Sequence, residues 1–272
     1  MTSTAAVALV LFLAENGRPD DPQKQKEDEL SARRLELMQK RIASVQVKSS
    51  EADFPTDFAS KPIFRYFDPA RGYISAAVWK LGGQGRPRAF ITTELRPNFF
   101  GSPRIVYEYL SLTPTRFSAT GGDVHWEPKG SALDFKSIPA APPPEETAPR
   151  RLLQMRAMAK RFGGSELVEK ENCDLRLLPQ PVDRYSPSAS DGADGAIFLL
   201  AYGTNPELAL FMESDGKGWN FAVGRLSGAR SITLTIDGAQ VWEGTPVQYG
   251  MDQSYTASNA LAEIPGIAPG SN

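Results

Sequence analysis

The amino-acid sequence predicts an α+β fold made by tandem duplication of one unit, a helix followed by a small antiparallel β-sheet. Three observations lead to this prediction. Short motifs recur in the same order in both halves of the chain, at a nearly constant offset. An amphipathic helical pattern opens each half. Turn-separated strand patterns follow each helix, without the alternation of strands and helices that is typical of a parallel sheet.

The internal repeat is considered first, because an overlooked repeat leads to a wrong fold. The matched segments are 33–35 with 150–152 (Arg-Arg-Leu), 62–66 with 181–185 (Pro-x-x-Arg-Tyr), and 126–127 with 242–243 (Trp-Glu). We therefore predict a first repeat over residues 30–137 and a second over 150–244. A proline-rich linker at 138–149 joins them, and its composition favours a stiff, extended chain.

Each repeat opens with a predicted amphipathic helix. In the first, within 24–44, the apolar positions are Leu30, Leu37, Met38 and Ile42. The second helix has Thr147 as N-cap, Pro149 in its first turn and Gly163-Gly164 as its stop. Its apolar stripe is formed by Leu152, Met155, Ala159 and Phe162. The basic residues on its other face are interpreted as a solvated surface.

Strand patterns bounded by glycine and proline follow each helix. In the first repeat they cover 62–67, 74–81, 88–95, 104–112, 115–120 and 123–127. In the second repeat they cover 173–179, 196–202, 207–213, 219–226, 231–236 and 239–243. Asp237-Gly238 between the last two is the strongest short hairpin signal. Consecutive hairpins predict antiparallel sheets.

The two ends of the chain have their own patterns. An apolar run from Ala5 to Ala14 is too short to span a bilayer as a helix, which needs about 20 residues. It fits the apolar region of a secretory signal, although no Lys or Arg precedes it. We expect residues 1–14 to be a signal-like segment that directs export, 15–29 a charged lead-in, and 245–272 a flexible tail. The alternative is a short buried segment in a cytoplasmic protein.

Composition excludes several classes of function. The net charge is −2, so no overall positive field attracts nucleic acid. With one cysteine, Cys173, and one histidine, His125, neither an intramolecular disulfide nor a Cys/His zinc site can form. We expect no cofactor, no metal, no nucleic-acid partner and no membrane span in the mature chain.

Several charged and aromatic residues are retained in both repeats. They are Arg65, Tyr66, Glu94 and Trp126 in the first repeat, and Arg184, Tyr185, Glu213 and Trp242 in the second. A fold must be kept in both repeats, whereas a site can be kept in one, so we predict that these residues are structural. The arginine and glutamate of each repeat should form an ion pair, with the tyrosine packed beside it. The alternative is two equivalent ligand pockets.

The sequence contains no catalytic constellation. His125 is matched by Val241, which favours a strand position over a general base, and acidic neighbours of Cys173 disfavour a reactive thiolate. A carboxylate pair of the glycoside-hydrolase type stays open, because many glutamates are available: Glu94, Glu108, Glu127, Glu207, Glu213 and Glu243. Phe99 and Phe100 lie where the repeats differ in length, so we expect them to form a repeat-specific interaction site.

Four segments carry a resemblance to a known family. They are RRLLQMRAMAKRF at 150–162, LRLLPQPVDRY at 175–185, DGAIF at 194–198 and GTNPE at 203–207. They resemble uncharacterised exported proteins of planctomycete-type bacteria, over roughly residues 30–245. The resemblance implies an exported α+β protein and supplies no catalytic residue.

We therefore expect a non-catalytic exported protein, periplasmic, envelope-associated or secreted. It would bind a protein or envelope polymer, or contribute to the structure of the envelope. Two alternatives stay open. One is a hydrolase of an extracellular or envelope polymer with carboxylates between the repeats, for which two carboxyls about 5–10 Å apart would argue. The other is a carrier of a small apolar ligand, which needs a cavity of about 300 Å³ or more.

Overall fold

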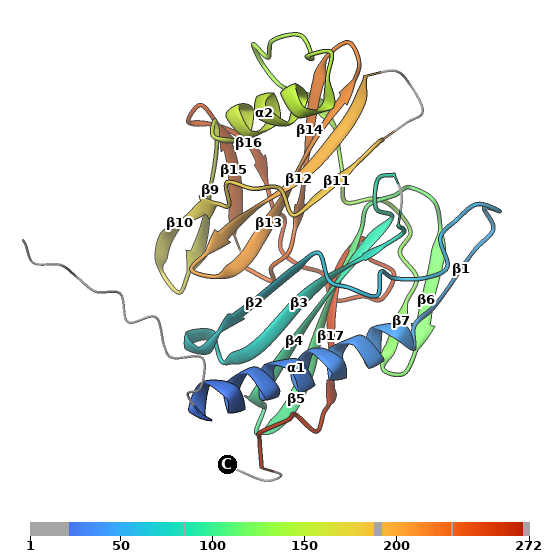
Figure 1. The fold of residues 1–272 in the computed structure, drawn as a ribbon, viewed down its shortest axis with the longest axis vertical. Coiled ribbons are helices and arrows are strands. Elements are labelled where there is room, and N and C mark those ends of the chain that lie inside the picture. Colours follow the sequence, from blue (N-terminus) through green and yellow to red (C-terminus); the bar gives the residue numbers. More distant parts are fainter. Residues whose placement is uncertain (1–21, 84, 188–191, 230, 269–272) are drawn as a thin grey trace, which may run out of the picture.

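A computed structural model describes residues 22–268, except residues 84, 188–191 and 230. The apolar run from Ala5 to Ala14, on which the expectation of export depends, lies outside the described residues. The described chain is mostly β, with two α-helices and three antiparallel sheets (Figure 1).

Two of the sheets contain only strands from the N-terminal half and the C-terminal end of the chain. The larger of these has five strands, in the order β17 (Tyr255–Leu261), β5 (Ser102–Ser111), β4 (Ala89–Phe99), β3 (Tyr73–Leu81) and β2 (Phe64–Asp68). The smaller has three, in the order β1 (Gln46–Ser49), β6 (Phe117–Gly121) and β7 (Val124–Trp126). A short 3₁₀ helix, η1 (Pro69–Arg71), joins β2 to β3.

The third sheet is larger and curls into a half-barrel, which we call the curled sheet. Its strands are, in order, β16 (Ala239–Glu243), β15 (Ile232–Ile236), β9 (Phe162–Val168), β10 (Glu171–Leu177), β12 (Ala193–Tyr202), β13 (Asn205–Asp215), β14 (Trp219–Arg225) and β8 (Lys136–Ser137). The short strand β11 (Asp183–Tyr185) also pairs with β12.

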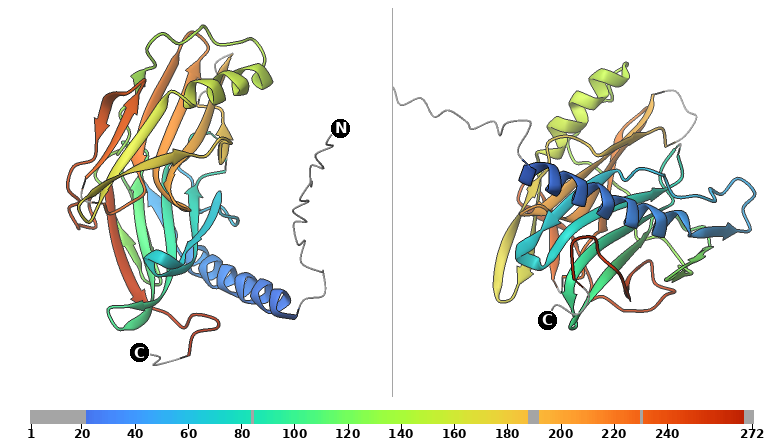
Figure 2. Two further views of the ribbon diagram at one scale, coloured as in Figure 1. Left: turned by 90° about the vertical axis from the view of Figure 1, so that its left-hand side faces the viewer. Right: turned by 60° about the horizontal axis from the view of Figure 1, so that its bottom comes forward.

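The helices lie at opposite ends of the molecule, with the five-stranded and curled sheets between them (Figures 1 and 2). Helix α1 (Pro22–Ala43) packs Met38 and Ile42 into the core of the five-stranded sheet. Helix α2 (Ala148–Ala159) begins after Thr147, as predicted. It ends before the predicted stop, because Gly163 and Gly164 lie in β9. At Gly164 a Cβ would meet Thr233 O at 3.0 Å, so the glycine serves close strand packing.

A third core holds the two large sheets face to face. Side chains alternate along each strand, so β12 sends Ile197 and Leu199 toward the five-stranded sheet, and Phe198 and Leu200 toward α2. Across the sheet interface the rings of Phe90 and Phe211 stack with centroids 5.9 Å apart. Burial on both faces explains why β12 is an almost continuous apolar run.

The predicted tandem duplication of helix-plus-sheet units is wrong, and so is the α+β class. Strands from the two halves do not form separate equivalent sheets: β8 from the first half forms an edge of the curled sheet. Strands β9 and β10 lie between β15 and β12, and β6 and β7 belong to a sheet of their own. The twelve predicted strands are all present and antiparallel, so the local pattern is confirmed while the assembly is not.

The C-terminal segment 245–272, expected to be a flexible tail, contains β17, which pairs with β5 from Tyr255 to Leu261. The charged lead-in 15–29 overlaps α1, which begins at Pro22. Sequence composition favoured disorder in both places, but partners distant in the sequence supply the hydrogen bonds and packing.

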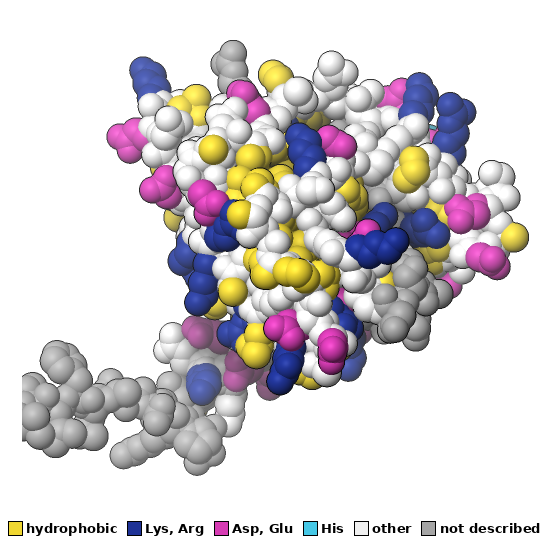
Figure 3. Space-filling model, turned by 90° about the horizontal axis from the view of Figure 1, so that it is seen from above, with side chains coloured by type: hydrophobic (Ala, Val, Ile, Leu, Met, Phe, Trp, Pro, Cys, Tyr) yellow, Lys and Arg dark blue, Asp and Glu magenta, His cyan; other side chains and the backbone are white. Residues whose placement is uncertain are grey.

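The surface around α2 carries charges of both signs, interspersed with hydrophobic side chains (Figure 3). Two arginines in or beside this helix are paired with carboxylates. Arg151 donates to Asp194 at 3.1 Å, and Arg161, just beyond the helix, donates to Asp237 at 2.6 Å. Local pairing leaves no single-sign field here. Within the described part of the chain, no helix has the length and hydropathy needed to cross a membrane.

The packing of the two large sheets can be tested by Phe211→Ala. Phe211 is fully buried against Phe90, so its truncation should lower the free energy of unfolding by about 3–5 kcal/mol. Phe67→Ala is the matched control, because that ring on β2 is 58% exposed and its loss should change the free energy by less than about 0.5 kcal/mol. Urea denaturation measures both; equal losses would contradict the interface.

Candidate functional site

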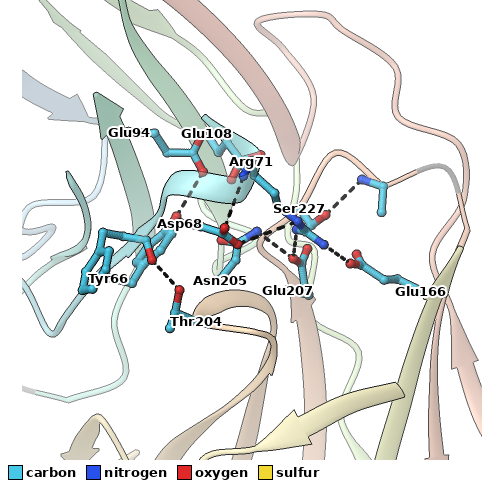
Figure 4. Close-up of polar contacts among 12 residues, drawn as sticks. Tyr66, Asp68, Arg71, Glu94, Glu108, Glu166, Thr204, Asn205, Glu207 and Ser227 are labelled. Atoms are coloured by element: carbon cyan, nitrogen blue, oxygen red, sulfur yellow. Dashed lines mark hydrogen bonds and ion pairs between the residues drawn. The ribbon is translucent and has the colours of Figure 1, made fainter. Parts of the chain in front are cut away.

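A cavity of about 600 Å³ lies between the two large sheets, and we call it the inter-sheet cavity. Its wall combines buried charged groups with aromatic rings. The lining residues are Arg71, Tyr73, Glu94, Arg96, Phe99, Phe100, Val106, Glu108, Asn205, Ser227, Gly228, Tyr249 and residues 257–259. Figure 4 shows the polar contacts in and behind this wall.

Arg71 connects the two sheets across the wall of the cavity. The η1 turn positions it: the Asp68 carboxylate accepts from the Arg71 backbone nitrogen at 3.2 Å, and Gly72 adopts a φ of 81° that glycine tolerates. The guanidinium then donates to Glu207 and, at 2.5 Å, to Glu166 (Figure 4). Those two carboxyls belong to β13 and β9 of the curled sheet, so one cation bridges two strands.

Glu207 is fully buried, and burial together with the neighbouring Glu166 raises its pKa to about 8 despite Arg71. The Asn205 amide nitrogen donates to Glu207 Oε1 at 2.6 Å. This contact fixes the orientation of the amide. The Asn205 side chain lines the inter-sheet cavity, and its Oδ1 has no hydrogen-bond partner among the described residues.

Glu94 on β4 is held from two sides. The Tyr66 hydroxyl donates to its Oε1 at 3.1 Å, and Arg96 donates to its Oε2 through Nε at 3.1 Å and Nη2 at 2.7 Å. The Arg96 guanidinium lies against the rings of Tyr73 and Phe99, with its carbon 4.7 and 4.9 Å from their centroids. Such stacking fixes the arginine in the cavity wall.

Glu108 on β5 faces the same cavity. The Tyr255 hydroxyl, on β17, donates to its Oε1 at 2.9 Å. Burial, and next the nearby charge of Glu94, raise the pKa of Glu108 well above its ordinary value. The raised pKa favours the protonated form of this carboxyl, in which it can act as a hydrogen-bond donor.

Aromatic side chains form the mouth of the cavity. Phe99 and Phe100 lie at the tight turn between β4 and β5, where Phe100 has a φ of 55° and Gly101 a φ of 78°. Phe100 is 80% exposed and Tyr249 is 71% exposed. The turn predicted as an interaction site thus lies beside the buried charged groups, and its role in binding stays a prediction.

The predicted Arg–Glu ion pairs are wrong in both halves. Arg65 donates to Ser31 Oγ at 3.0 Å, and Arg184 donates to Asp194 at 2.7 and 2.8 Å. The reason is strand alternation: each arginine precedes a tyrosine that faces the sheet interface, so the arginine must point to the opposite face.

The tyrosine, rather than the arginine, reaches the matched glutamate. Tyr185 donates to Glu213 Oε1 at 2.7 Å, as Tyr66 does to Glu94. Glu213 also binds an arginine that was not predicted: Arg86 donates to its two carboxylate oxygens at 2.6 and 2.5 Å.

The other residues singled out in the sequence lie away from the cavity. Trp126 is buried and donates to Gln253 O at 3.0 Å, and Trp242 is partly buried against the core under α2. His125 is exposed on β7, and Cys173 is partly buried on β10. Over the described ranges, no three His, Cys, Asp or Glu side chains are grouped as a metal site would require.

Sequence reasoning missed Arg71, Arg96 and Asn205. For Arg71 a signal exists, because Asp68-Pro69 followed by Gly72 is typical of a capped turn that fixes the residue inside it. For Asn205 none exists, since its role depends on its distance from Glu207 and on the sheet packed above it.

Comparison with known proteins gives no match to a family model, to a curated protein or to a solved structure. The function is therefore argued from the geometry of the site.

Buried Glu207 makes stability depend on pH. Its pKa is about 8 in the folded chain and near 4.5 when unfolded, so the folded state binds more protons between these values. The free energy of unfolding should fall as pH rises from about 5 to 8, by up to about 1.4 kcal/mol per pH unit from this group. Glu108 adds to the loss in the same direction. Denaturant titrations at several pH values measure the slope.

The variant Glu207→Gln should flatten that slope, because glutamine does not titrate in either state and the difference in bound protons between the folded and unfolded chains disappears. Glu127→Gln is the control: Glu127 is exposed on the surface, and its variant should keep the wild-type slope. A Glu207→Gln slope as steep as that of the wild type would contradict this assignment.

Proposed function

We propose that the chain is a non-catalytic exported binding protein and that its ligand occupies the inter-sheet cavity. One observation carries the proposal. Two strongly exposed aromatic rings, Phe100 and Tyr249, flank a cavity whose wall is built from buried charged groups. Concave sites that combine apolar surface with a few fixed polar groups are typical of ligand binding.

The backbone at the mouth supports this proposal. Phe100 has a positive φ, which is unfavourable for a bulky residue, and it buries little surface in return. Strained positions of this kind cluster at ligand-contacting sites. A residue kept in a strained, exposed position contributes little to folding, so contact with a ligand is the simplest account of it.

Export is supported by the apolar N-terminal run from Ala5 to Ala14. An exported protein with an open cavity would meet ligands from the periplasm or the medium. The inter-sheet cavity is large enough for a metabolite or for one side chain of a larger partner.

Hydrolysis is the second candidate, because Glu94 and Glu108 line one cavity. A raised pKa suits Glu108 to the role of general acid. Both oxygens of Glu94, however, already accept hydrogen bonds from Tyr66 and Arg96, which weakens this carboxylate as a nucleophile or base. Binding without turnover is therefore favoured. The third possibility, a carrier of a small apolar ligand, is disfavoured because charged side chains line the cavity.

A ligand screen tests the proposal. Compounds that differ in charge (amines, carboxylic acids and neutral sugars) are added to the purified protein, and thermal shift and calorimetry measure binding. A true ligand should raise the melting temperature and should be recovered unchanged. The double variant Phe100→Ala/Tyr249→Ala should weaken its binding by about tenfold or more, since each buried ring contributes about 1 kcal/mol or more.

The matched control is Leu153→Ala, which removes a 61% exposed apolar side chain on α2 and should bind like the wild type. Two results contradict the proposal. One is the absence of binding in all three classes. The other is cleavage of the ligand by the wild type that is lost in Glu108→Gln, which would support the hydrolase.

A further inference from the structure

Resting on the proposed binding function, we infer that the inter-sheet cavity takes an organic cation. Its ammonium group would contact Asn205 and Glu108, and its apolar part would lie between Phe100 and Tyr249. The shared chemistry is an alkylammonium group, whether on a small amine or on a lysine side chain.

The first observation in favour of a cation is a hydrogen-bond acceptor without a donor, the side-chain oxygen of Asn205. The Asn205 amide is fixed by its bond to Glu207, and its Oδ1 is left without a partner in the part of the chain that the structure describes. The residue is 5% exposed and lines the cavity. An unpaired buried acceptor costs about 1–3 kcal/mol, so a bound group that donates a hydrogen bond here is favoured.

The second step is the balance of charge around the cavity. The carboxyls that face it or lie directly behind its wall are Asp68, Glu94, Glu108, Glu166 and Glu207, and the guanidiniums are Arg71, Arg96, Arg104 and Arg225. Carboxyls therefore outnumber cations. Arg225, moreover, donates to the backbone carbonyls of Ser227, Thr245 and Ala229, not to a carboxylate.

Bound protons offset this excess of carboxyls over guanidiniums. Burial and neighbouring carboxyls raise the pKa of both Glu108 and Glu207. A ligand ammonium placed beside Glu108 would supply the missing positive charge. Glu108 would then ionise and release its proton to solvent, so the total charge of the site would be conserved while an ion pair replaces a neutral acid.

The third step distinguishes a cation from a neutral donor. A sugar hydroxyl could also donate to Asn205, but it would leave the excess of carboxyls unchanged. Aromatic rings flank the mouth, and ring faces attract ammonium groups as well as apolar ones. The excess of carboxyls and the aromatic rings at the mouth of the cavity thus both favour an organic cation as the ligand.

The test uses three probes of nearly equal shape: 2-phenylethylamine, 2-phenylethanol and 3-phenylpropionate. Calorimetry at pH 7 in two buffers of different ionisation enthalpy measures affinity and proton release. The amine should bind at least tenfold more tightly than the alcohol, with release of up to one proton. The acid should bind most weakly. Affinity for the amine should rise with pH, by up to tenfold per unit, as long as Glu108 is protonated in the free protein.

Glu108→Gln keeps the shape of the side chain and removes its charge. It should abolish the proton release and weaken amine binding by about tenfold or more, while alcohol binding changes little. Glu127→Gln on the surface is the control and should behave like the wild type. Acetyl-lysine amide, with its side-chain ammonium free, separates the two sources: binding as tight as that of the amine would indicate a lysine side chain as ligand.

Equal binding of amine and alcohol, preference for the acid, or proton release that persists in Glu108→Gln would overturn the inference. If the amine fails while a sugar or acid from the broader screen binds at Phe100 and Tyr249, the cation inference is wrong and the proposed function stands. If no compound binds, both are wrong.

Discussion

The bridge from Arg71 to Glu166 and Glu207 is the contact on which the site depends. One guanidinium joins the five-stranded sheet to two strands of the curled sheet, and the carboxyls it holds are almost fully buried. Two buried carboxyls cannot both be neutralised by one cation without a proton, and this explains the raised pKa of Glu207. Apolar packing around Phe90 and Phe211 holds the two large sheets together. The ion pairs of Arg71 with Glu166 and Glu207 connect the sheets beside the inter-sheet cavity.

Sequence patterns predicted the strands well and their assembly poorly. Alternation and Gly/Pro boundaries located twelve strands, because those signals are local. The strands missed were β1, β8, β9, β11 and β17, which are short or lie in segments rich in small and polar residues. Sheet membership depends on contacts between distant segments, such as β17 with β5, and no local pattern encodes those contacts.

The site was predicted in part. The Phe99–Phe100 turn was identified as a candidate because it lies where the two supposed repeats differ in length, and the glutamates were noted because carboxyls are visible in the sequence. The recurring Arg-Tyr and Glu motifs also located a real contact, but assigned it to the wrong partner. The error concerned one position along a strand, and a shift of one residue moves a side chain to the opposite face. The roles of Arg71 and Asn205 could be identified only from the three-dimensional structure.

The two Tyr–Glu contacts show why a recurring motif need not make two equivalent sites. Glu213, in the curled sheet, is bound by Arg86 from the loop between β3 and β4 of the five-stranded sheet, so a cation from across the interface covers this carboxylate. In the five-stranded sheet, the arginine on Glu94 comes from the same strand, two residues along, and stacks sideways on Tyr73 and Phe99. Among the described residues, no cation from the curled sheet bonds to Glu94, and the space beside Glu94 is part of the inter-sheet cavity. The position of the arginine along the chain therefore decides which of the two glutamates lines the inter-sheet cavity.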